Sequence, residues 1–235
     1  MTGMELRLAA RRGENVLVMI VIPAVVLLFF ASVTVLPFAG RPVDFLLPGS
    51  IALAIVATGM VNLGIATAYE RYYGVLKRLG GSPLPRSGLL AAKVASVLTI
   101  ELAQVILLVA IGTLVLGWRP AGPVSIGLLV IGLALGTGAF TGIGLAMAGG
   151  LRAEATLAVA NLLFIGFMLL GGIVLPLDHL PNWLTAVSAL LPASALADTV
   201  RVALGGAGDA LPRIAVLAAW AVAASAIAAA TFRWE

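Results

Sequence analysis

One charged stretch between two long apolar runs decides how the chain must be organised: AYERYYGVLKRLGGSPLPR, residues 68–86. As a single helix, it gathers its apolar residues on one side by their spacing: Tyr69, Tyr72, Tyr73, Leu76 and Leu79. Its charged residues lie mostly elsewhere: Glu70, Arg71, Lys77 and Arg78. The glycines at 80 and 81 and Pro83 would then end the helix. We therefore predict a short amphipathic helix here.

Two interpretations of this helix are open from its residues. It is either a solvated helix at the membrane surface, with its Tyr side chains in the headgroup layer, or a docking helix that receives force from a soluble partner. A docking helix needs an apolar face to seat in its partner, charges to orient it, and a short connection to the spans beside it. The stretch at 68–86 has all three.

The composition makes lipid the main solvent of the chain. Of its 235 residues, 62% are hydrophobic and only 10% are charged, whereas soluble domains carry roughly 25% charged residues. This is too little polar surface to cover a globule in water. The absence of cysteine excludes disulfides and thiolate metal sites. The net charge is only +4, and cations beside apolar spans are typical of membrane topology, so we expect no nucleic-acid partner.

Six apolar runs are about long enough to cross a hydrocarbon core of about 30 Å. They occupy residues 16–36, 48–68, 88–116, 124–148, 156–175 and 211–231. Pro23 should kink the first of them. Residues 1–14 interleave apolar and charged side chains and predict an amphipathic interfacial helix. We predict an all-α membrane protein with six transmembrane helices in a single domain, residues 1–235.

The distribution of cations predicts the orientation. With six spans, both termini lie on one side, and four of the fourteen Lys and Arg residues fall on the other: Arg41, Arg119, Arg201 and Arg213. The remaining cations share the side of the termini and of the charged stretch. The positive-inside rule therefore predicts that both termini and the stretch at 68–86 are cytoplasmic.

Residues 176–208 form neither a full span nor an ordinary loop. They hold two apolar stretches of about ten residues, interrupted by proline, and such stretches are too short to cross a bilayer at about 1.5 Å per residue. Irregular backbone within lipid is tolerated only where protein or a water-filled cavity covers it. We predict two short re-entrant helices that dip in from the outer face. Two helices lying flat on that face are the alternative.

With both stretches in view, the chain resembles the ABC-2 type permeases, the membrane subunits of ATP-driven exporters, and among them the daunorubicin-resistance type. The resemblance covers nearly the whole chain. One part of it is Glu70-Arg71 followed by Lys77-Arg78-Leu79 and Pro83. The other follows the fifth span: Gly171-Gly172, Pro176, Leu180-Pro181-Asn182-Trp183-Leu184, Leu191-Pro192 and Arg201.

The resemblance implies an exporter of a hydrophobic or amphiphilic substrate, a drug or a lipid, working by alternating access in the plasma membrane. A second permease, identical or paralogous, would complete the membrane core, as in efflux systems of multidrug resistance. Two ATP-binding subunits would dock beneath it and hold ATP and Mg²⁺. This chain would bind no cofactor. It lacks the Gly-x-x-x-x-Gly-Lys-Ser/Thr phosphate loop, so we expect a transport subunit and not an enzyme.

The resemblance also assigns roles to residues. Residues 69–86 would be the coupling helix and its connector, with these contacts to the ATPase: Tyr69, Glu70, Arg71, Tyr72, Tyr73, Leu76, Lys77 and Arg78. Residues 176–208 would form the outer gate. The substrate path or gate would include Glu101, Gln104, Asn62, Asn161, Pro176, Trp183 and Pro192.

Glu101 lies about twelve residues into the third span, near the bilayer midplane. A carboxyl group there costs roughly 2.5 kcal/mol or more, so it must be paired, protonated or facing water. It could line the substrate path or carry a proton. The structural alternative is a neutral Glu101 hydrogen-bonded to Gln104, or to Asn62 or Asn161 on a neighbouring span.

Two other classes of protein fit the sequence less well. An intramembrane enzyme, a protease or a lipid-modifying enzyme, needs a catalytic constellation, and the one histidine, His179 beside Asp178, has no evident partners for one. An ion-driven transporter predicts internal repeats, and none is evident. The glycines between 132 and 144 superficially resemble a nucleotide-binding motif. Within an apolar span they favour close helix packing instead.

Overall fold

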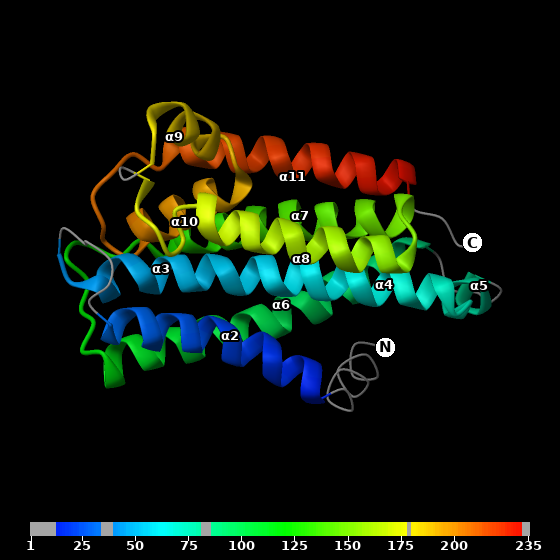
Figure 1. Cartoon of the computed structure of the whole chain (residues 1–235), viewed down its shortest axis with the longest axis horizontal. Coiled ribbons are helices and arrows are strands. Elements are labelled where there is room, and N and C mark those ends of the chain that lie inside the picture. Colours follow the sequence, from blue (N-terminus) through cyan, green and yellow to red (C-terminus); the bar gives the residue numbers. More distant parts are fainter. Residues whose placement is uncertain (1–12, 34–39, 81–85, 178–179, 232–235) are drawn as a thin grey trace.

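The computed structural model describes residues 13–33, 40–80, 86–177 and 180–231, and within them it forms a bundle of helices without strands (Figure 1). The predicted amphipathic helix at 1–14 falls almost entirely outside the described residues. So do His179 and the connector at 81–85. The all-α membrane fold is confirmed.

The helices follow one another with short connections, including two segments of π-helix (η). In chain order they are α2 (Gly13–Ser32), α3 (Pro42–Ile55), η1 (Val56–Asn62), α4 (Leu63–Tyr72), α5 (Val75–Gly80), α6 (Arg86–Ala110), η2 (Ile111–Val115), α7 (Ile126–Gly150), α8 (Ala153–Leu170), α9 (Asn182–Ala189), α10 (Pro192–Ala203) and α11 (Leu211–Thr231).

Five helical segments of the described chain are long and apolar enough to cross a membrane: Pro42–Tyr72, Ala91–Val115, Ile126–Gly150, Ala153–Leu170 and Leu211–Thr231. The pair α9 and α10 passes the same test but is bent by 78°, as a broken span or a re-entrant loop would be. Counted as a span, it makes six. The predicted first span is occupied by α2, and the part of this helix whose side chains are described, Met19–Ser32, is apolar. Proline at position 23 lies inside that helix.

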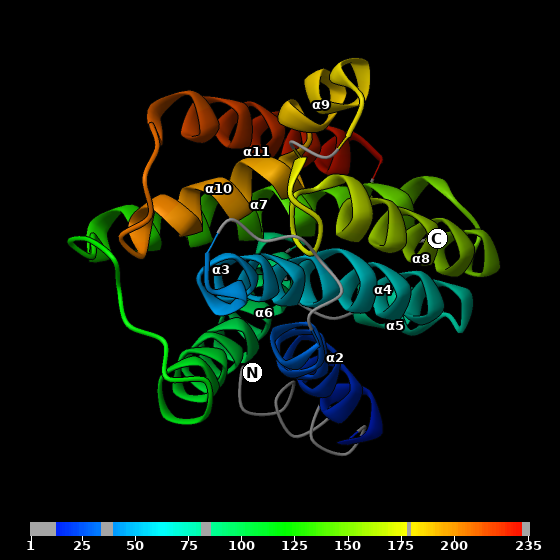
Figure 2. The same cartoon turned by 60° about the vertical axis from the view of Figure 1, so that its left-hand side comes forward.

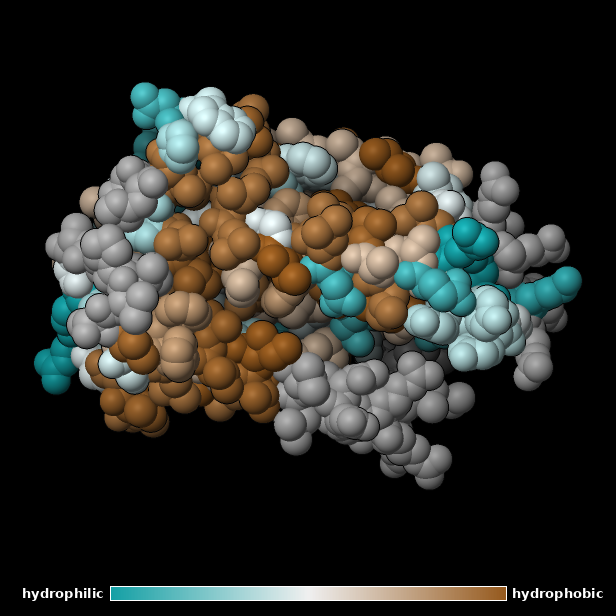
Figure 3. Space-filling view, viewed as in Figure 1, coloured by the Kyte–Doolittle hydropathy of each residue, from teal (hydrophilic) through white to brown (hydrophobic). Residues whose placement is uncertain are grey.

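The second span is the core of the bundle. It runs through α3, η1 and α4 as one continuous helical segment of 31 residues and is the most buried of the candidate spans. In two views, α2 and α6 lie on one side of it, and α7, α8 and α10 on the other, with α11 beyond α7 (Figures 1 and 2). The hydrophobic surface in Figure 3 covers the middle of the molecule, and hydrophilic residues gather toward its ends.

Glycines of α7 let its neighbours approach closely, as the spacing predicts. A Cβ at Gly144 would lie 2.8 Å from the carbonyl oxygens of Gly59 and Met60 in η1. A Cβ at Gly142 would lie 2.8 Å from the backbone of Ala224 in α11. Backbone contacts this short need glycine, and they place α7 between the core helix and α11.

The prediction of one amphipathic helix after the second span is wrong. The membrane helix itself continues through Tyr69 and ends at Tyr72, and a turn at Gly74, with a φ of 70°, separates it from the six-residue α5. Glycine accepts this left-handed conformation without the strain that a Cβ would add. Because the turn redirects the chain, Leu76 is 1% exposed, while Tyr72 and Tyr73 are 64% and 66% exposed. These residues do not share one apolar face.

Different helix ends and connections lie at the two ends of the bundle. The beginning of α2, the end of α11, the α7–α8 turn and α5 lie toward one end, called here the α5 end (Figure 1). The beginning of α3, the α6–α7 connection and the α9–α10 region lie toward the opposite end, the far end. The described ends of α2 and α11 therefore share one end of the molecule with the charged stretch.

Candidate functional site

At the α5 end, charged side chains tie the end of α4 to two other helices. The Nζ of Lys93 on α6 donates to the Glu70 carboxylate at 2.6 Å, and Lys93 is only 4% exposed. Arg71 donates from Nη1 to the Gly149 carbonyl at 2.6 Å and from Nη2 to the Leu151 carbonyl. Glu70 and Arg71, which the resemblance assigns to the contact with the ATPase, thus also have partners within the chain.

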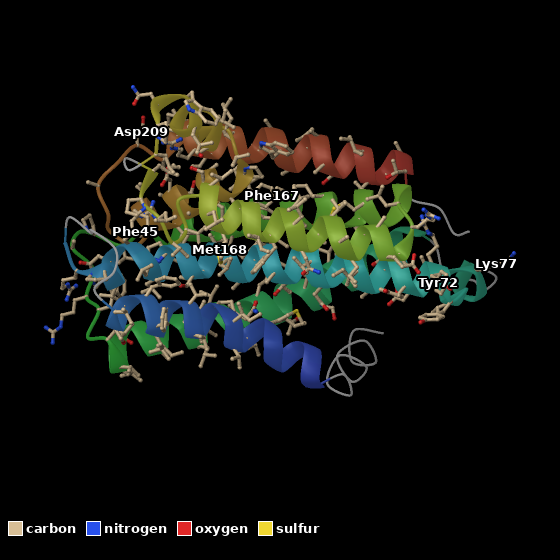
Figure 4. All side chains as sticks on the ribbon, viewed as in Figure 1. Phe45, Tyr72, Lys77, Phe167, Met168 and Asp209 are labelled. Atoms are coloured by element: carbon tan, nitrogen blue, oxygen red, sulfur yellow. The ribbon has the colours of Figure 1, made fainter. Side chains whose placement is uncertain are left out.

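Beyond these contacts, an aromatic group and a cation remain at the surface. The Tyr69 and Tyr73 rings stack with their centroids 6.1 Å apart, and Tyr72 meets Tyr73 edge-on at 5.1 Å. Lys77 of α5 is exposed and lies at the same end of the molecule as Tyr72 (Figure 4). This group, Tyr69, Tyr72, Tyr73 and Lys77, is called the α5 surface. Arg78 lies in α5, but its side chain is outside the described residues.

Midway along the bundle, a buried polar layer joins four helical elements. The Thr58 hydroxyl of η1 donates to Oε1 of Gln104 on α6 at 3.0 Å, and Nε2 of Gln104 donates to the Met19 carbonyl of α2 at 3.1 Å. Thr137 of α7 lies within hydrogen-bonding distance, 2.5 Å, of Oε2 of Glu101. The layer holds α2, η1, α6 and α7 together within an apolar core.

Glu101 is buried as expected, but the predicted partners are wrong. Its hydrogen-bond partner is Thr137, not Gln104, Asn62 or Asn161. Asn161 is exposed on α8 and donates to the Leu157 carbonyl of its own helix. Asn62 is half-buried at the end of η1. The sequence places Glu101 at the right depth but does not show which span faces it.

The predicted gate residues do not form one group at the far end. Trp183 of α9 is 69% exposed, whereas Pro192 is buried at the beginning of α10. Pro176 lines a cavity of about 270 Å³ together with Gly172 and Arg201. This cavity lies where α3, α9, α10 and α11 meet.

Comparison with known families now decides the class of protein. The family model of the ABC-2 type transporter matches residues 1–204. The chain belongs to the ABC-2 type transporter family. A search of curated proteins finds no match. Membership makes the chain a permease component of an ABC transporter, a multi-pass membrane subunit that is not itself an enzyme, and it implies an ATP-binding partner in general.

Sequence reasoning missed part of this ABC-2 permease's polar framework. The hydroxyls of Thr58 and Thr137 were not singled out, although Ser and Thr within an apolar span commonly hydrogen-bond between helices. Lys93 was counted only among the cations on the side of the termini, and its pairing with Glu70 was not foreseen. Its partner is 23 residues away in sequence, so only helix packing could reveal it.

Proposed function

We propose that this ABC-2 permease is the membrane subunit of an ATP-driven exporter and that the α5 surface receives the movement of its ATPase. The observation that carries the proposal is that the α5 surface exposes aromatic rings and a cation, while the charges beside it are used to fix α4 to the bundle. Exposed aromatic residues are typical of interface centres. A helix end fixed in this way transmits displacement without slack.

Two contacts supply the route for that displacement. The Glu70–Lys93 pair links the end of α4 to α6, and Arg71 links it to the α7–α8 turn. A push on α5 would therefore move the core helix together with α6, α7 and α8. Such a concerted shift is what alternating access requires, because two arrangements of the packed helices must be exchanged as units.

The transported molecule would be hydrophobic or amphiphilic, a drug or a lipid. The membrane-facing helices are strongly apolar, and the buried polar layer of Glu101, Gln104, Thr58 and Thr137 is small. A second permease, identical or paralogous, would supply the other wall of the path, and two ATP-binding subunits would carry ATP and Mg²⁺. The α5 end would face the cytoplasm in the plasma membrane, with both termini on that side.

Cross-linking can test the docking role because the chain has no cysteine of its own. Lys77→Cys places a unique thiol on the α5 surface, and Leu114→Cys places one on η2, where Leu114 is 84% exposed. In native membranes, a thiol-directed photocross-linker at residue 77 should capture a polypeptide with a phosphate-loop motif, and the linker at residue 114 should not. Capture of no ATP-binding subunit, or equal capture from both positions, would contradict the proposal.

Single thiols at residues 77 and 119 report orientation. A membrane-impermeant maleimide should label Lys77→Cys only after the cells are opened. It should label Arg119→Cys in intact cells, because Arg119 is exposed in the α6–α7 connection at the far end. The reverse pattern would place the α5 surface outside and leave it without access to ATP.

A further inference from the structure

A cavity at the far end combines an excess of positive charge with a size that suits a small ligand. It has a volume of about 270 Å³ and is lined by Asp198 and Arg201 of α10, Arg213 of α11 and Phe45 of α3, among others. Ligand pockets for drug-sized molecules usually span about 300–1,000 Å³. The cavity can therefore hold an ion or a headgroup, but not the whole of an amphiphilic cargo.

Two guanidinium groups share a single carboxylate in this cavity. Arg201 donates from Nη1 to Oδ1 of Asp198, and Nε of Arg213 lies 3.1 Å from Oδ2 of the same residue. Among the described residues that line the cavity, these three are the charged ones. One positive charge is thus left without a counter-charge in a partly buried place, where solvent screens it poorly.

Both guanidinium groups keep N–H donors without a partner in the described part of the chain, although Nη2 of Arg201 also donates to the Gly172 carbonyl at 3.1 Å. Nε of Arg201 is buried and has no hydrogen-bond partner among the described residues, and the group lies 4.2 Å from the centre of the Phe45 ring. Arg213 is about one-third exposed, at 32%, and its hydrogen bond to the Ala189 carbonyl is long at 3.4 Å. A ligand that enters the cavity can therefore reach Arg213.

We propose that this cavity binds a phosphate group, held by Arg213 and Arg201. The planar guanidinium fork matches the oxygens of phosphate, and such charge-assisted hydrogen bonds are strong. The bound anion would balance the unpaired positive charge, while Phe45, Pro176 and Leu177 provide an apolar wall. The phosphate group would come either from an anionic lipid headgroup at the membrane surface or from free phosphate.

Two arms of one experiment distinguish these sources and use the full-length chain without an ATPase, so the result is independent of the coupling proposal. In detergent, inorganic phosphate is titrated at constant ionic strength, and the unfolding temperature is followed against chloride. In nanodiscs of phosphatidylcholine with or without phosphatidylglycerol, native mass spectrometry counts the phosphatidylglycerol that stays bound. Stabilisation by phosphate alone identifies a free anion, and retained phosphatidylglycerol alone identifies a lipid headgroup; either supports the proposal.

Three variants should change phosphate binding in different ways. Arg213→Gln should weaken binding by about tenfold or more, because it removes a charge-assisted contact. Asp198→Asn removes the competing carboxylate and should strengthen binding. Arg119→Gln, a matched loss of one exposed cation at the same end, should leave it unchanged. Binding in neither arm, unchanged binding by Arg213→Gln, or an equal loss with Arg119→Gln would overturn the proposal.

Discussion

The α5 end and the far end of the bundle use their charged residues differently. At the α5 end, Glu70 pairs with Lys93, 23 residues away, and Arg71 reaches carbonyls about eighty residues away. At the far end, two ion pairs join residues only three apart: Arg41 with Asp44, and Asp198 with Arg201. Arg41 also donates to the Gly117 and Arg119 carbonyls, but these contacts are longer, at 3.3 Å. Arg41 is exposed, and its hydrogen bond to Asp44 raises its pKa above the usual value.

The difference shows what each end can transmit. Pairs between distant helices fix those helices against each other, so a displacement of α4 at the α5 end is shared by α6 and by the α7–α8 turn. Pairs within one helical turn hold no second helix. Among the ion pairs of the described residues at the far end, the Asp198–Arg213 pair, from α10 to α11, is the exception, and there two arginines compete for one carboxylate beside a cavity. Charged side chains at one end join three helices, whereas the other end retains an excess of positive charge beside its cavity.

The largest effect should come from breaking the buried pair at the α5 end. Lys93→Met leaves the Glu70 carboxylate partly buried without its partner, which should lower the free energy of unfolding by about 3 kcal/mol. Unfolding in mixed micelles would measure it. The double variant Glu70→Gln with Lys93→Met should recover most of the loss, because no unpaired charge remains. A loss in the double variant as large as in the single one would mean that the charge is not the cause.

Close packing of α7 on the core helix holds the middle of the bundle between its two ends together. Gly144→Ala would place a Cβ 2.8 Å from two backbone oxygens of η1, so α7 must shift away from the core helix. We expect a loss of about 2 kcal/mol in the free energy of unfolding. Gly138→Ala, on the same helix, meets only an ordinary contact at 3.6 Å and is the matched control. Equal stability of both variants would show that the close approach does not stabilise the bundle.

Arg71→Gln should have a smaller effect on stability and a clear one on coupling. It removes the two contacts to the α7–α8 turn and should lower the free energy of unfolding by about 1–2 kcal/mol. In the complex with the ATP-binding subunit, substrate-stimulated ATP hydrolysis should fall, while subunit binding persists. Arg152→Gln removes an exposed cation next to the same turn and serves as the control. Hydrolysis as high as in the unchanged protein would exclude Arg71 from the route of movement.

The smallest effect should come from the exposed pair at the far end. Asp44→Asn removes an ion pair within one helical turn, and solvent screens this pair because both side chains are exposed. The unfolding temperature and ATP hydrolysis should both stay within experimental error. A loss approaching that of Lys93→Met would erase the distinction between the two ends.

The fold was largely predictable from the sequence, and the site only in part. The all-α membrane class follows from apolar runs that match the bilayer, and the close approach of α7 follows from its glycines. The helix break at Gly74 was missed, because the spacing of Tyr69 and Tyr72 fits the end of the membrane helix as well as it fits a separate amphipathic helix. Thr137 was missed as the partner of Glu101, because nothing in a single span shows which residue of another faces it.

The sequence by itself determined that this chain lies in a membrane, where its helical runs begin and end to within about six residues, and where a charged stretch separates two of its apolar runs. These properties are local, since they depend on run length, hydropathy and the backbone preferences of glycine and proline. Only the tertiary structure decided that Glu70 and Arg71 fasten α4 within the bundle, which residue Glu101 meets, and where two arginines share one carboxylate. Those partners lie far apart along the chain, and the packing of the helices brings them together.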